Sequence, residues 1–305
     1  MSTEKYLERY SEAISDSAND QYLSAAKKFL EYSKGNLTGA AVRSYIAAMQ
    51  NEQYAPGTIQ WHYGVIRRLF RTNKVDWPLE RKDSPTVPEG EVFAPAIPDR
   101  RVIQMIEACK KSNSLSSDHI MVMALSSVYG IRQIEAASIR PQDVMLDSGG
   151  GEILVRTAKR GRQRFHMIPP EIVPWISGIE DTGLLHLQAR NGTANNSLFR
   201  KLFLQIEEEA GLRHIIETGW HSIRRILVRL LVDAGIPELT VTEFLRWKTG
   251  DGGAMIGQYY RAQVVDDDPS MRTGMGGRQS ESDAKIFEDH PFIKHWGTKD
   301  VEEEI

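Results

Sequence analysis

Cysteine is nearly absent from the sequence. Cys109 is the single cysteine among 305 residues, which excludes an internal disulfide framework and is typical of a protein from a reducing compartment. The eight histidines do not follow the spacing of a metal site. We therefore expect no bound metal, no cofactor and an intracellular location.

Long hydrophobic runs and export signals are lacking as well. No apolar stretch approaches the roughly 18 residues that a membrane-spanning helix needs. The first residues, MSTEKYLERYSEAISDS, are polar and charged, unlike a secretory signal peptide. We expect no membrane partner.

A large charge of one sign is also missing, because the formal net charge is −3. The charges are unevenly distributed, however. Residues 266–305 hold 11 acidic and 5 basic side chains, so the preceding 265 residues carry a net charge of +3. A mildly basic body permits a nucleic-acid partner but does not by itself indicate one.

The N-terminal part of the chain has the hydrophobic periodicity of helices. Apolar residues recur at helical spacing over residues 20–35, 37–52 and 55–75. Short connections between helices are typical of a compact bundle. We expect a helical domain over residues 1–82.

A second domain is predicted beyond a proline-rich linker. Residues 83–98 contain four of the 13 prolines and predict an extended segment. Residues 99–264 predict mostly helices, with one β-hairpin between strands at 152–157 and 164–168. The fold class is therefore mainly α with a small antiparallel sheet. Residues 265–305 form an acidic C-terminal tail.

Five short motifs in the second domain carry side chains suited to phosphate chemistry. YGIRQIEAASI holds Arg132, with Glu135 one helical turn later, and TAKRGRQR forms the basic turn of the hairpin. HSIRR puts a histidine and an arginine on one helical face, and FLRWKTGDGGA and MIGQYYRAQ follow. The side chains of interest, in chain order, are Arg132, Lys159, His221, Arg224, Trp247 and the pair Tyr259 and Tyr260.

The order of these motifs resembles the tyrosine recombinase, or phage integrase, family. The resemblance extends over about residues 15–262, because TIQWHYGVIRRLF is similar to part of the family's core-binding domain. It implies a helical, SAM-like core-binding domain followed by an α+β catalytic domain. It also implies DNA strand cleavage and rejoining through a covalent 3′-phosphotyrosine, without metal or ATP. One departure is Leu-Arg-Trp at 245–247, where family members usually have Leu-Gly-His.

Elementary chemistry agrees with this resemblance. Guanidinium groups are always charged and offer forked donors to phosphate oxygens, so Arg132 and Arg224 are candidates for a phosphate clamp. His221 would share those oxygens or accept the proton of the nucleophile, and Trp247 can donate an indole N–H. The resemblance implies that Lys159 protonates the leaving 5′ oxygen. Arg160 and Arg162, in the same turn, are the alternative candidates for that role. Tyr259 is the preferred nucleophile and Tyr260 the alternative.

Binding of double-stranded DNA and self-association follow from this hypothesis. We expect a tetramer on DNA, a monomer or weak dimer in its absence, and a location at DNA in the nucleoid or nucleus. The tail either docks on a neighbouring protomer or is disordered. Alternatives are a type IB topoisomerase, a telomere resolvase, an inactive DNA-binding descendant, and a helical module with chance motifs. The basic side chains expected to contact DNA are Lys27, Lys28, Arg67, Arg68, Arg71, Lys74, Arg160 and Arg162.

Overall fold

The computed structural model describes residues 2–14, 19–86, 95–147, 150–156, 163–247, 256 and 282–297. The chain forms two compact units, Met1–Val92 and Phe93–Ile305. Each unit has a hydrophobic core of its own. Among the described residues, no helix combines the length and the apolar character needed to cross a membrane.

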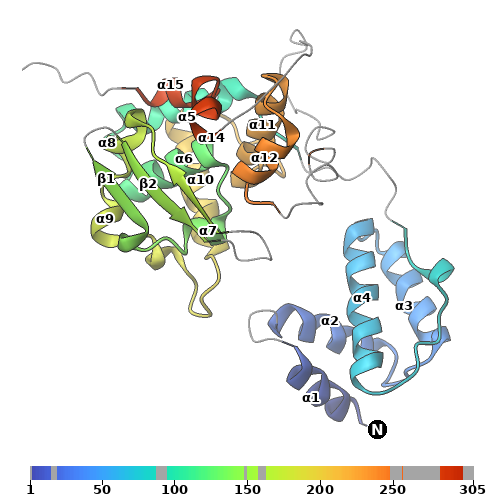
Figure 1. Ribbon diagram of the computed structural model, residues 1–305. Coiled ribbons are helices and arrows are strands. Elements are labelled where there is room, and N and C mark those ends of the chain that lie inside the picture. The colour runs from blue at the N-terminus through green and yellow to red at the C-terminus, as the bar shows by residue number, and fades with distance from the viewer. Residues whose placement is uncertain are drawn as a thin grey trace, which may run out of the picture. The chain divides into compact units, whose positions relative to one another are not determined.

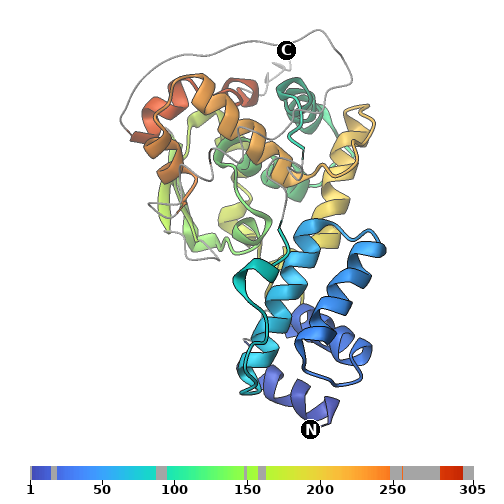
Figure 2. The ribbon, with the colours of Figure 1, turned by 90° about the vertical axis from the view of Figure 1, so that its right-hand side faces the viewer.

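The first unit is built from helices. They are α1 (Thr3–Ala13), α2 (Asn19–Tyr32), α3 (Gly39–Asn51) and α4 (Pro56–Thr72), followed by a short 3₁₀ turn at Arg81–Asp83. The three helices predicted from periodicity are thus confirmed to within a few residues, whereas α1 was not predicted as a separate helix. Helix α4 runs beside α3 (Figures 1 and 2).

Local sequence explains where these helices begin. The side chain of Thr38 accepts a hydrogen bond of 3.2 Å from the backbone N of Ala41, which caps α3. Pro56 stands at the first position of α4, where a missing N–H costs nothing. Rings then fill the core, with Phe29 edge-on to Tyr45 at 5.5 Å and Phe70 edge-on to Trp77 at 5.1 Å between centroids.

The second unit joins helices to one small sheet. Its helices are α5 (Asp99–Lys111), α6 (Ser117–Tyr129), α7 (Gln133–Ala136), α8 (Val173–Ile176), α9 (Ile179–Thr182), α10 (Asn196–Glu209), α11 (Trp220–Asp233), α12 (Glu238–Phe244), α14 (Ser282–Glu288) and α15 (Ile293–Trp296). Short 3₁₀ turns lie at Pro141–Asp143, Pro170–Ile172 and Leu185–Leu187. The predicted fold class, mainly α with a small antiparallel sheet, is confirmed.

The sheet has three strands where the sequence predicted two. The strands β1 (Val144–Asp147), β2 (Gly150–Val155) and β3 (Arg164–Met167) pair antiparallel in the order β1-β2-β3. The extra strand β1 has only four residues, too few for a clear alternation of apolar and polar side chains. Gly151 fixes its pairing with β2, because at a φ of 144° a Cβ would lie 2.1 Å from the carbonyl O of Met145.

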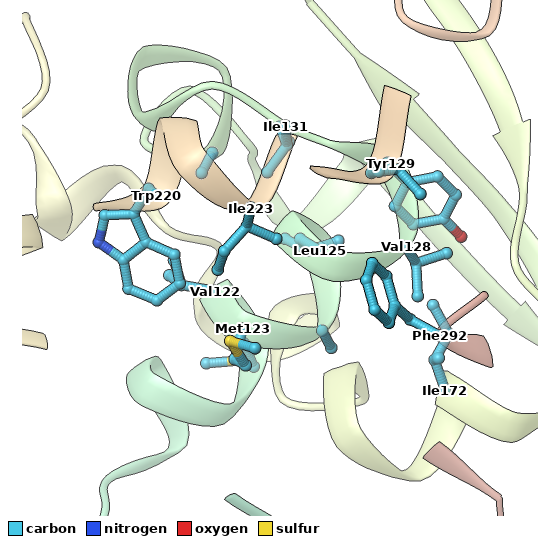
Figure 3. Close-up of a cluster of buried hydrophobic side chains, with 14 of the residues drawn as sticks. Val122, Met123, Leu125, Val128, Tyr129, Ile131, Ile172, Trp220, Ile223 and Phe292 are labelled. Atoms are coloured by element: carbon cyan, nitrogen blue, oxygen red, sulfur yellow. The ribbon is translucent and has the colours of Figure 1, made fainter. Parts of the chain in front are cut away.

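Helix α6 occupies the centre of the second unit. Almost all of its side chains are buried, as expected for a helix that is apolar on every face. Figure 3 shows a cluster of buried hydrophobic side chains, with Trp220 of α11 near one end, Ile223 of the same helix near the middle and Phe292 of the C-terminal segment near the other end. The sheet lies on one side of the unit, and α11 and α12 lie on another (Figure 1).

The described part of the C-terminal tail is folded onto the unit of its own chain. Ile286, Phe292 and Trp296 are fully buried. The indole N of Trp296 donates to Ser127 Oγ at 2.9 Å, and His290 Nε2 lies 2.9 Å from the carbonyl O of Val128. Of the two alternatives for the tail, disorder is therefore wrong for residues 282–297, because their apolar side chains complete the core around α6. Docking on a neighbouring protomer stays a prediction.

Candidate active site

Arg132 stands at a tight turn between α6 and α7. Gly130 ends α6 with a φ of 53°, and a Cβ there would come within 3.0 Å of the Leu245 side chain, so the turn requires glycine. Arg132 then caps α7. Glu135, at the third position of α7, accepts hydrogen bonds from the backbone N of Arg132 at 2.9 Å and from its Nη1 at 2.6 Å.

This pair has one exposed and one buried member. The side chain of Arg132 is 28% exposed, whereas that of Glu135 is 1% exposed. Burial by itself would raise the pKa of Glu135, but the guanidinium groups of Arg246, Arg224 and Arg132 together lower it to about 2. Glu135 is therefore ionised at neutral pH and holds a guanidinium that still reaches solvent.

Arg224 connects two turns that lie far apart in the sequence. It is fully buried in α11. Its Nη1 donates to the carbonyl O of Gly130, and its Nη2 donates to that of Leu245 at 2.8 Å. The first carbonyl precedes the turn to Arg132 and the second precedes the turn to Trp247. Arg224 thus fixes the relative position of both motifs.

Trp247 lies against the same guanidinium. The Cζ of Arg224 is 5.3 Å from the centroid of the Trp247 ring, which is the geometry of a cation–π contact. The side chain of Trp247 is 5% exposed. The structure therefore brings the FLRW motif to the HSIR helix, as the hypothesis requires.

His221 belongs to the same electrostatic neighbourhood. Its side chain is solvent-exposed near the start of α11. Partial desolvation lowers its pKa well below the ordinary value, and the cations Arg224, Arg225 and Arg132 lower it further, while Glu135 acts in the opposite direction. His221 is therefore uncharged at neutral pH and offers one N–H and one acceptor nitrogen.

Four of the predicted catalytic side chains, Arg132, His221, Arg224 and Trp247, thus meet in one cluster. Ile256 is buried in the core of the second unit, three residues before the first candidate nucleophile. The remaining predicted side chains lie outside the described residues. They are Lys159, Arg160 and Arg162 of the hairpin turn, and Tyr259 and Tyr260.

Sequence reasoning missed one fully buried arginine in this cluster. Arg246 stands directly before Trp247, and its Nη2 donates to Glu135 Oε2 at 3.0 Å. The signal was present, because a charged residue between Leu245 and Trp247 interrupts an apolar run. It also occupies the position where family members usually have glycine.

The predicted DNA-binding side chains of the first unit lie on α2, on α4 and just beyond α4. Lys27, Lys28, Arg67, Arg71 and Lys74 are exposed, as contact with a phosphate backbone requires. Arg68 is half-buried, and its Nη2 donates to the carbonyl O of Ala13 at 2.8 Å. Arg68 therefore has at least one structural role, which is to hold the end of α1 against α4.

Fold and site together define a two-unit α-helical protein with a cationic cluster between α7, α11 and the end of α12. The model of the phage integrase family matches residues 96–264, more than half of the chain. The protein therefore belongs to the phage integrase family, that is, to the tyrosine recombinases. Among curated protein sequences, none matches significantly.

Solved structures with the same fold are distant in sequence. The lambda integrase (75–356) dimer bound to a COC′ core site is 14% identical, with a TM-score of 0.63 over 91% of this chain and 100% of that one. The XerH site-specific recombinase bound to palindromic difH substrate is 16% identical, with a TM-score of 0.62 over 79% and 75%. The Tn1549 transposon integrase is 11% identical, with a TM-score of 0.55 over 85% and 95%.

Proposed function

We propose that the protein is a site-specific DNA recombinase, or integrase, that cleaves and rejoins DNA strands through a covalent 3′-phosphotyrosine. The observation that carries this proposal is the convergence of Arg132, His221, Arg224 and Trp247 from three separate motifs. Membership of the phage integrase family supports it. The chemistry needs neither ATP nor a metal, since the side chains of the cluster supply the charge.

The cluster suits a phosphate because its net charge is positive. Arg132, Arg224 and Arg246 contribute three positive charges and Glu135 one negative charge, which leaves +2. Arg132 is partly exposed and would contact the non-bridging oxygens directly. Arg224 is buried in this structure, so its charge is weakly screened by water and would act on the same oxygens through the protein interior. Donors fixed where charge develops each contribute about 3 kcal/mol to catalysis.

The chemical step conserves a phosphodiester-type bond. The phenol oxygen of Tyr259, or of Tyr260, attacks phosphorus and the bond from phosphorus to the 5′ oxygen breaks. The phenol proton passes to His221, and the ammonium of Lys159 gives a proton to the leaving 5′ oxygen. The products are a 3′-phosphotyrosine and a free 5′ hydroxyl, and attack by such a hydroxyl reverses the step and rejoins a strand.

His221 has a second role that its low pKa favours. A neutral imidazole can donate its N–H to a non-bridging oxygen while Arg132 occupies another. Arrival of an anionic phosphate raises the pKa of the ring, which makes it a better proton acceptor once DNA is in place. Trp247 would donate its indole N–H to the same phosphate.

Double-stranded DNA and further copies of this chain are the proposed partners. The exposed cations of α2 and α4 would neutralise phosphates, which makes binding strongly dependent on salt. Structures with the same fold include a lambda integrase tetramer bound to a Holliday junction, 15% identical with a TM-score of 0.60 over 88% of this chain and 80% of that one. This supports a tetramer on DNA, formed from monomers or weak dimers. The protein would act where DNA is, in a nucleoid or nucleus.

The test is covalent capture of DNA. The full chain is incubated with end-labelled, nicked duplexes whose central sequence is randomised. Cleavage of an intact phosphodiester close to the nick frees a short strand that carries the 5′ hydroxyl, and its loss by diffusion traps the covalent intermediate. Denaturing electrophoresis should show labelled DNA attached to protein, and mass spectrometry should place it on Tyr259 or Tyr260. The Tyr→Phe variant of the linked residue should lose the adduct, and the other variant should retain it. Absence of any adduct, or an adduct on another residue, would reject the proposal.

A further inference from the structure

Arg246 adopts a backbone conformation that ordinary side chains avoid. It stands two residues after Phe244, the last residue of α12, with a φ of 60°, in the left-handed region that favours glycine. Its side chain is nevertheless one of the largest fully buried groups in the protein. A buried guanidinium is costly unless it is paired and hydrogen-bonded. Both features indicate that the surroundings specify arginine here.

Four acceptors surround the Arg246 guanidinium. Nη2 donates to Glu135 Oε2 at 3.0 Å and to the carbonyl O of Tyr129 at 3.4 Å. Nη1 donates to the carbonyl O of Phe244 at 3.1 Å and to His166 Nε2 at 2.9 Å. These acceptors come from α7, the end of α6, α12 and β3, so one side chain joins four elements around the site.

Arg246 shares Glu135 with Arg132. Oε2 of Glu135 accepts from the backbone N of Arg132 and from Arg246, and Oε1 accepts from Nη1 of Arg132. Without Arg246, the Glu135–Arg132 pair would be neutral overall. With Arg246, the three side chains carry a net charge of +1, and the positive charge nearest solvent is that of Arg132.

A histidine and an aspartate hold Arg246 from the other side. Arginine only donates, so His166 accepts at Nε2 and carries its proton on Nδ1, which lies 3.3 Å from Asp283 Oδ2. Asp283, on α14, also accepts from Arg164 Nη2 at 2.5 Å. Burial lowers the pKa of His166 to about 4, with Asp283 opposing and Arg246 and Arg164 reinforcing the shift. A neutral His166 thus lies between Asp283 of the C-terminal segment and Arg246.

We propose that Arg246 is a positioning residue. Its buried guanidinium neutralises Glu135, the carboxylate that fixes Arg132, and so leaves the charge of Arg132 available to a phosphate. Asp283 anchors this arrangement from the C-terminal segment. This proposal rests on the proposed function for its catalytic consequence. Its structural part does not, because the position and mobility of Arg132 are properties of the free protein.

The first experiment uses the full chain without DNA. Arg246→Gly removes the guanidinium and suits the left-handed backbone, and Arg246→Lys retains a charge but cannot reach all four acceptors. The heteronuclear NOE of the Arg132 Nε–H, assigned by its loss in Arg132→Lys, should be high in the wild type and fall clearly in both variants. It should fall less in Asp283→Asn. The pKa of His166 should rise in Arg246→Gly, since a neighbouring cation is lost.

The second experiment compares rates of adduct formation at saturating DNA, with a duplex selected from the captured pool. Arg246→Gly should slow the step at least tenfold without a matching loss of affinity, and Arg246→Lys should recover part of the rate. Arg101→Met is the matched control, because Arg101 is 5% exposed and paired with the buried Glu207 at 3.2 Å, and the two residues lie on α5 and α10 rather than on the elements that carry the cluster. It should lose stability and retain the rate.

The outcomes separate this proposal from the proposed function. An unchanged Arg132 mobility in Arg246→Gly overturns the proposal whatever the DNA assay gives. Equal loss of rate in Arg246→Gly and Arg101→Met would assign Arg246 a purely structural role and also overturn it. If the wild type forms no adduct, the proposed function fails, and the mobility measurement alone decides the positioning role. If Arg246→Gly does not fold, Arg246→Lys carries both readouts.

Discussion

Replacing Trp296 by alanine tests whether the C-terminal segment is part of the second unit. Trp296 is fully buried, its ring centroid lies 5.7 Å from that of Trp175, and its indole N donates to Ser127 Oγ. Its carbonyl O accepts from the indole of Trp175 at 2.8 Å, a bond that alanine retains. The variant therefore loses the ring and one hydrogen bond while the local backbone bond remains.

The expected cost is large for a position so close to the end of the chain. A buried Trp→Ala change lowers the free energy of unfolding by about 3–5 kcal/mol. For a unit of this size, each kcal/mol corresponds to about 2–4 °C in Tm, so the loss should be roughly 6–20 °C. Ser127 is not left unsatisfied, because its hydroxyl also donates to the carbonyl O of Met123 at 2.8 Å.

Differential scanning calorimetry of the full chain measures this effect. Ile216→Ala is the control, because Ile216 is 82% exposed and its loss should change the free energy of unfolding by less than about 0.5 kcal/mol. The Tm of the wild type should not depend on protein concentration, since the segment packs on its own chain. A loss below about 1 kcal/mol in Trp296→Ala, or a Tm that rises with concentration, would refute packing within one chain.

Three further predictions concern the sheet, the buried histidines and the DNA surface. Gly151→Ala should lower the free energy of unfolding by about 3 kcal/mol or more, since its Cβ would overlap the β1 backbone, whereas Gly192→Ala, with a φ of 74° and open space around it, should cost about 1 kcal/mol in urea titrations. Burial lowers the pKa of His166 to about 4 and that of His290 to about 3, so the unfolded chain binds protons at a higher pH than the folded chain. The contribution of these histidines to the free energy of unfolding should be complete above about pH 6.5 and fall as the pH drops towards 4. Unfolding curves measured against pH without that loss would contradict the burial of the two histidines. Replacing both Lys28 and Arg71 by uncharged residues should weaken the binding of duplex DNA. It should also reduce the magnitude of the slope of log K, the binding constant, against log salt concentration by about 2. An unchanged slope would mean that these two side chains do not contact DNA phosphates.

Local patterns were sufficient to predict much of the fold. The helices of the first unit follow from the spacing of apolar residues and from residues that favour a helix start, such as Thr38 and Pro56. Both signals act within a few residues. The strand β1 escaped prediction because four residues show no reliable period, and its pairing depends on glycines that only the register explains. The placement of the tail could not be predicted, because Trp296 is buried against Ser127 and Trp175, which lie 169 and 121 residues earlier in the chain.

The candidate site also has a part that the sequence predicts and a part that it does not. Arg132, His221 and Arg224 were recognisable because their motifs stand in the order that resembles the family, and the structure brings them together with Trp247. Arg246 was not recognisable as a site residue, since its acceptors on Glu135 and His166 lie 111 and 80 residues away in sequence. Nothing local indicates that a charged side chain beside a tryptophan is fully buried. The nucleophile and Lys159 stay predictions from sequence.

The cluster combines exposed and buried cations for a physical reason. A phosphate must leave water to be held tightly, and a low-dielectric surrounding strengthens its attraction to nearby charges. Arg132 and His221 reach solvent and can meet an incoming strand, whereas Arg224 and Arg246 are fixed by backbone carbonyls and by Glu135 before any ligand arrives. Because the buried groups are already ordered and Glu135 already holds Arg132, an incoming phosphate would not incur the cost of reorganising them. The turn at Gly130 and the left-handed residue at 246 are therefore connected through Arg224 and Glu135, and a change at either should be felt first at Arg132.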